Sequence, residues 1–80
     1  TMSFYGEYHK DGLHMVHEID DDDFGLKSEV HYIISHNDVK RLFSMISEKE
    51  FIELCRKDGT DGMLKFFEAH GILNRRETAY

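Results

Sequence analysis

The chain has 80 residues, of which 40% are hydrophobic and 32% are charged, a size and composition that fit one domain with one modest core. Its six Phe and four Tyr residues supply the bulk that disordered chains lack. No apolar run approaches the ~20 residues that a membrane-spanning helix needs, and the first residues lack the basic patch and apolar stretch of a secretion signal. We expect residues 1–80 to form a single soluble α+β domain.

Cysteine content bears on both location and catalysis. Cys55 is the one cysteine of the chain, and a secreted domain of this size usually needs disulfides, so we expect a cytoplasmic protein. Cys55 falls late in a predicted helix and on its apolar face, where burial and the negative end of the helix dipole both disfavour the thiolate. We therefore interpret it as a core residue and not as a nucleophile.

The net charge of −6 is concentrated in the first half of the chain. Residues 1–38 carry nine acidic and two basic side chains, whereas residues 39–80 carry seven acidic and eight basic ones. A negative field attracts basic proteins and repels phosphate groups. We therefore expect a basic protein partner and no binding to nucleic acid or to an anionic membrane. The alternative is a solvated face that aids solubility.

Alternation of apolar and polar residues predicts three β-strands, over residues 4–10, 13–19 and 26–34. Asp11-Gly12, between the first two strands, is typical of a two-residue type I′ hairpin turn. In the second hairpin, pairing Met15 with Val30 keeps the large apolar side chains on one face. The first half of the chain is therefore predicted to form a three-stranded antiparallel meander with one apolar face.

From Ser35 onwards the apolar residues recur at helical spacing. Ser35, Ser47 and Thr60 fit the N-cap positions of three helices, and Gly59 fits the end of the second one. Three helices packed on one face of a three-stranded sheet make an α+β two-layer sandwich, with residues 72–80 either frayed or added as an edge strand. Side chains expected between the layers include Met15, Phe43 and Phe67.

The acidic run at residues 20–23 partly matches the start of a calcium-binding loop. If Asp20 is position 1, Phe24 occupies position 5, which needs an oxygen ligand, and His31 occupies position 12, which needs a bidentate Glu. An EF-hand loop also lies between helices, whereas this run lies between predicted strands. We expect a solvated turn or a protein-contact loop in preference to a cation site.

The predicted register sets three of the six histidines side by side across the strands, on the face opposite the apolar one. These are His9, His14 and His31. Because neighbouring strands lie ~4.8 Å apart, three imidazoles in a row could hold zinc and leave a fourth position open to water. Glu7 and Glu29 would then accept hydrogen bonds from the rings. The alternative is an exposed face without metal, since metal ligands usually lie where water is partly excluded.

The same outward face is predicted to combine an apolar patch with an acidic rim. Tyr5, Val16 and Ile33 would lie at the centre as exposed anchors, with carboxylates around them. Protein interfaces commonly have this anatomy. The residues predicted to contact a partner are Tyr5, Glu7, Val16, Glu18, Asp20, Asp21, Asp22, Asp23, Glu29 and Ile33.

Catalytic motifs are missing from the sequence. It contains no nucleophile elbow, phosphate-binding loop or isolated acid–base pair, so we expect a non-enzymatic protein without a cofactor, an acidic inhibitor or adaptor that occupies a basic groove on its partner. In size, charge and lack of catalytic groups the chain resembles the small acidic immunity proteins with which bacteria neutralise toxic nucleases. The alternatives are a zinc-binding protein or metal-dependent enzyme built on the histidines, and a homodimer paired through an exposed sheet edge.

Overall fold

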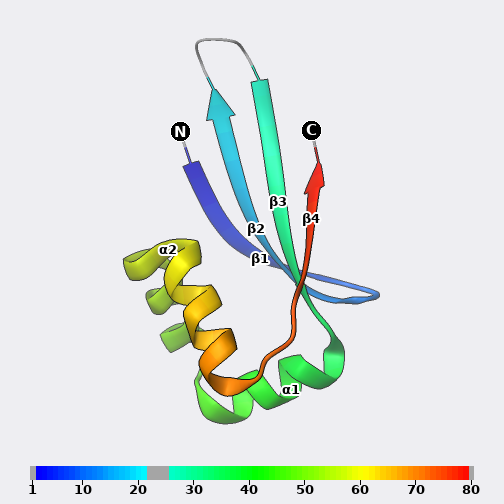
Figure 1. Cartoon of the computed structure of the whole chain (residues 1–80), viewed down its shortest axis with the longest axis vertical. Helices are drawn as coiled ribbons and strands as arrows, with labels where there is room; N and C mark the ends of the chain where they lie inside the picture. Colours follow the sequence, from blue (N-terminus) through cyan, green and yellow to red (C-terminus); the bar gives the residue numbers. More distant parts are fainter. Residues whose placement is uncertain (1, 22–25, 80) are drawn as a thin grey trace.

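The chain folds into four strands and two helices within residues 2–21 and 26–79, which are the residues that the computed structural model describes. The strands are β1 (Met2–His9), β2 (Gly12–Asp21), β3 (Leu26–Ile34) and β4 (Arg75–Ala79), and they form one antiparallel sheet in this order. The helices α1 (His36–Met45) and α2 (Glu48–His70) connect β3 to β4 (Figure 1). The α+β class is confirmed, but three strands and three helices are corrected to four and two.

The turn between β1 and β2 lies one residue earlier than predicted. His9 pairs with Gly12, so the turn residues are Lys10 and Asp11. Gly12 has a φ of 139°, and it approaches the end of β3 so closely that a Cβ atom would overlap the carbonyl oxygen of Ile34. Gly12 is therefore the first residue of β2 and not a turn residue. A glycine is needed there because any side chain would collide with the backbone of β3. The change shifts the register of the hairpin by two residues.

The register between β2 and β3 is also shifted by two residues, because Met15 pairs with Tyr32 and not with Val30. Side chains alternate between the two faces of a sheet with a period of two residues. A shift by an even number therefore leaves every side chain on its predicted face. The predicted division into an apolar face and an outward face holds although the predicted pairs are wrong.

The core lies between the apolar face of the sheet and the helices. Its buried residues are Leu13, Met15, Val30, Tyr32 and Ile34 from the sheet, and Leu42, Phe51, Cys55, Met63, Phe67 and Ile72 from the rest of the chain. The Phe51 ring stacks on Phe67 at a centroid distance of 5.8 Å and meets the edge of Phe43 at 6.0 Å. Met15 and Phe67 are buried as predicted, whereas Phe43 is only partly buried.

Serine caps begin both helices as predicted. The Ser35 hydroxyl accepts a hydrogen bond from the backbone N–H of Asp38, and the Ser47 hydroxyl accepts one from that of Glu50. The predicted third helix is the second half of α2, which continues through a kink at Gly59, where φ is 69° and ψ is −161°. Neither helix of the described residues is long and apolar enough to cross a membrane.

The segment after α2 is tied to α1 by an ion pair. Asp38 accepts hydrogen bonds from the Arg41 guanidinium at 3.1 Å and from the backbone N–H of Leu73 at 3.3 Å. Arg41 also donates to the carbonyl oxygen of Gly71 at 2.9 Å, and Ile72 is buried in the core. These contacts direct the chain to the edge of β3, where β4 forms. Of the two outcomes predicted for the C-terminal residues, the edge strand is the one observed.

Candidate functional site

The sheet face away from the core, which we call the outer face, carries most of the predicted partner-binding residues. Both described helices pack on the opposite face (Figure 1). Three of the rows in which residues lie directly opposite one another on the outer face are Ser3-Glu18-Glu29-Ala79, Tyr5-Val16-His31-Glu77 and Glu7-His14-Ile33-Arg75. The structure thus brings predicted residues of all three strands of the meander onto one surface.

Two of the three predicted apolar anchors are not exposed. Val16 has 0% of its surface exposed and Ile33 has 5%. Val16 lies between Tyr5 and His31 in its row, and Ile33 lies between His14 and Arg75. Long side chains on both flanks cover the short β-branched ones, so the prediction of an exposed aliphatic patch is corrected.

Tyr5 remains accessible, with 39% of its surface exposed. Its hydroxyl donates a hydrogen bond to Glu18 Oε1 at 3.0 Å, and Ser3 donates to the other oxygen of Glu18 at 3.0 Å. The hydrogen bond to Glu18, followed by desolvation and the charges of nearby carboxylates, raises the pKa of Tyr5 to about 12. The phenol is therefore held neutral and oriented across the strands.

A hollow of about 310 Å³ opens near one end of the sheet. At this end the strands β2 and β3 extend beyond the helices (Figure 1). It is lined by Ser3, Glu18, Ile19, Asp20, Lys27, Ser28 and Glu29. Three of these residues carry carboxylates and one carries an amine, so the lining has a net negative charge. Residues 22–25 lie outside the described residues, and with them most of the calcium-loop prediction and the predicted contacts of Asp22 and Asp23.

Two histidines of the outer face meet directly. His14 Nδ1 and His31 Nδ1 are 3.0 Å apart. The other ring nitrogen of each histidine meets a carboxylate: His14 Nε2 lies 2.7 Å from Asp11 Oδ1, and His31 Nε2 lies 3.0 Å from Glu29 Oε1. Only 8% of the His14 surface is exposed. This histidine pair is therefore a largely buried polar cluster on a face that sequence reasoning treats as open to water.

The third predicted histidine, His9, lies next to the pair but outside the hydrogen-bonded chain. Its ring centroid is 4.0 Å from that of His14, and its Nε2 atom lies 2.9 Å from Glu7. Glu7, and not His9, is directly opposite His14, so the histidines approach one another diagonally. Within the described residues, no group of three or more His, Cys, Asp or Glu side chains is arranged to hold a metal ion.

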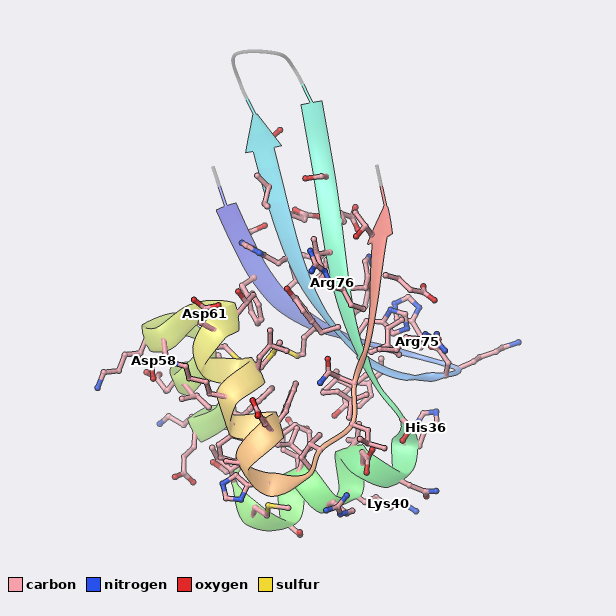
Figure 2. The ribbon with its side chains drawn as sticks, viewed as in Figure 1. His36, Lys40, Asp58, Asp61, Arg75 and Arg76 are labelled. Atoms are coloured by element: carbon pink, nitrogen blue, oxygen red, sulfur yellow. The ribbon has the colours of Figure 1, made fainter. Side chains whose placement is uncertain are left out.

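Two residues of this cluster are missing from the sequence-based site. Asp11 accepts hydrogen bonds from His14 and, through Oδ2, from Arg75 at 3.1 Å, and the bond with His14 lowers the pKa of its carboxyl. Arg75 lies at the start of β4, level with the turn between β1 and β2 (Figure 2), and also pairs with Glu77. The Asp-Gly signal predicted Asp11 only as a turn residue. Arg75 lies in the edge strand, which was one of two outcomes predicted for residues 72–80 and had no register from which its neighbours could be assigned.

Cys55 is buried in the core, as expected. Desolvation raises the pKa of its thiol to about 11. Since the thiolate is the nucleophilic form, the protonated thiol is unreactive at neutral pH. Cys55 is therefore a packing residue.

Comparison with known proteins gives no relative from which to infer function. No protein-family model matches the chain, and no curated protein or solved structure is significantly similar to it. Function is therefore inferred from the geometry of the outer face.

Proposed function

We propose that this protein is a non-enzymatic binding module whose outer face receives a basic protein partner, as an inhibitor that masks a basic groove does. The observation that carries the proposal is the carboxylate-lined hollow at the end of the sheet, close to the exposed ring of Tyr5. An immunity-type protein that masks a nuclease-like partner is the protein class that fits this function best.

The electrostatics of the hollow favour a cation from outside. Glu18 and Glu29 are directly opposite each other on neighbouring strands, and like charges in this position destabilise a sheet. Asp20 adds a third acidic side chain, whereas Lys27 is the single basic side chain among the described residues of the lining. A Lys or Arg side chain of a partner would relieve this repulsion and form charge-assisted hydrogen bonds. The hollow therefore suits a basic side chain better than a neutral one.

The apolar part of the interface is small. Because Val16 and Ile33 are buried, Tyr5 is the remaining aromatic anchor among the predicted contacts. An interface of this kind depends on charge for its association rate and on a few anchors for its lifetime. Association should therefore slow steeply as salt screens the carboxylates, whose field extends ~8 Å at physiological ionic strength.

The experiment starts with affinity capture of the partner from the native cell and continues with binding kinetics of the purified pair at low and physiological salt. The test variant is Glu18→Gln/Asp20→Asn/Glu29→Gln. The control is Glu53→Gln/Asp61→Asn/Glu68→Gln, which makes the same charge change at exposed positions of α2 (Figure 2 shows Asp61). We expect the association rate to fall roughly tenfold or more in the test variant, and much less in the control.

Tyr5→Ala separates the anchor from the charges. We expect it to speed dissociation about 30-fold, which corresponds to the ~2 kcal/mol of an interface hot spot, while the association rate changes little. An acidic partner, or equal effects of the two triple variants, would contradict the proposed function.

A further inference from the structure

The hydrogen bonds of the histidine pair determine where its protons lie. A neutral imidazole carries one N–H group. In His14 and His31 the Nε2 atom faces a carboxylate, so the proton lies on Nε2 and donates to Asp11 or Glu29. Rotating either ring by half a turn would direct a C–H group at the carboxylate. Both Nδ1 atoms are therefore left with lone pairs.

These two lone pairs face each other across 3.0 Å. Such an arrangement is repulsive unless a positive species lies between the nitrogens, and that species is either a shared proton or a metal ion. Imidazole nitrogens bind divalent transition metals at about 2.0–2.1 Å. At that bond length, nitrogens 3.0 Å apart subtend roughly 94° at the metal, which is close to the angle between neighbouring ligands in tetragonal or octahedral coordination.

The surroundings of the pair favour a doubly charged ion over a single proton. Four carboxylates adjoin the two histidines through hydrogen bonds or as direct cross-strand neighbours, those of Glu7, Asp11, Glu29 and Glu77. Among the described residues in contact with this group, Arg75 supplies a guanidinium through its bond to Asp11. The formal charges of these carboxylates and of Arg75 sum to −3. Attraction to this charge is larger for a divalent ion than for a proton, and the side chains of His14 and His31 are only 10% and 19% exposed, which limits screening by water.

We infer that His14 and His31 bind one divalent transition-metal ion through their Nδ1 atoms. Asp11 and Glu29 act through the histidines: each accepts the Nε2–H bond that orients the ring, as carboxylates beside metal-bound histidines commonly do. Because the described residues provide no group of three ligands, water occupies the remaining coordination positions. The site is separate from the carboxylate-lined hollow except for Glu29, which belongs to both.

The test uses the purified chain and the chlorides of Cu²⁺, Ni²⁺ and Zn²⁺, with isothermal titration calorimetry at neutral pH. We expect one ion per chain for at least one of these metals. Binding should be lost in His14→Ala and in His31→Ala and retained in the control His70→Ala, which removes an exposed histidine at the end of α2. Asp11→Asn changes an exposed side chain and leaves both ligands in place, so it tests the site even if His14→Ala fails to fold. Affinity should fall about 10- to 100-fold in that variant.

Long-range ¹H–¹⁵N NMR spectra of the imidazoles distinguish a metal ion from a shared proton. In the metal-free chain we expect each histidine to keep its proton on Nε2, with the two unprotonated Nδ1 atoms moved apart by their repulsion. The added metal should then perturb both Nδ1 resonances. A proton bonded to Nδ1 together with no response to any of the three metals would overturn the proposal. So would metal binding that survives in both histidine variants.

Discussion

Replacing Phe67 with alanine removes the ring on which the core packing most depends. Phe67 is 1% exposed and stacks on Phe51 with an angle of 24° between the rings. Truncating a buried Phe to Ala costs about 3–5 kcal/mol, from lost transfer free energy and from the cavity that remains. A chain of 80 residues has a free energy of unfolding of roughly 4–12 kcal/mol at 0.05–0.15 kcal/mol per residue. The substitution should therefore remove a large share of the stability.

Urea unfolding followed by circular dichroism measures the loss of free energy. In a separate thermal unfolding experiment the melting temperature should fall by at least ~12 °C, since each kcal/mol corresponds to about 4–8 °C in a domain of this size. Leu73→Ala is the matched control, because Leu73 is 76% exposed and its loss should stay within ~0.5 kcal/mol. Phe43→Ala should lie between the two, since Phe43 is partly buried. A loss below ~1 kcal/mol in Phe67→Ala would refute the packing.

Two further predictions concern backbone geometry and pH. Gly12 and Gly59 both have positive φ. Gly59, with φ 69° and ψ −161°, lies in a backbone region that is essentially restricted to glycine, so Gly59→Ala should cost about 1–3 kcal/mol. Gly12→Ala should cost clearly more, because its Cβ atom would overlap the Ile34 carbonyl oxygen, and equal losses in urea unfolding would contradict this. The pKa of Tyr5 is raised to about 12, against 10.0 for a free phenol. The protonated phenol therefore contributes to the stability of the folded state, in full below pH 10, and this contribution is lost as the pH rises through about 12. The phenolate absorbance of wild type minus that of Tyr5→Phe should titrate near pH 12, and a midpoint near 10 would show that the bond to Glu18 is absent.

The strands and their faces were predictable because the face of each side chain depends only on whether its position along the strand is odd or even. Alternation of apolar and polar residues identifies which side chains share a face, and both register errors were shifts by two residues, which preserve the face. The position of the turn was not predictable, because Gly12 is required by the close approach of the Ile34 backbone and not by the turn. That contact joins residues far apart in the chain, and a reading based on local turn chemistry does not include it.

The fourth strand was harder to predict because its sequence is that of a charged tail. Arg75, Arg76 and Glu77 lack an apolar alternation, yet charged side chains are common on edge strands, which they protect from pairing with other molecules. The strand is positioned by Asp38 and Arg41 of α1 and by the burial of Ile72. Without the register of β4, neither the burial of Ile33 beside Arg75 nor the hydrogen bond from Arg75 to Asp11 could be predicted.

The assignment of side chains to one face of the sheet predicts that the histidines lie close together, but not which of their ring atoms meet. A shift of two residues moves a side chain ~6.6–6.8 Å along its strand, and diagonal neighbours ~7–8 Å apart remain within reach of long side chains. For this reason His9, His14 and His31 still meet, although none of them lies directly opposite another. Their ligand chemistry, however, depends on which nitrogen faces which group. With His9 directed at Glu7 and with both Nδ1 atoms of the pair directed at each other, the face supplies two ligands to one metal ion and not the three of a zinc centre.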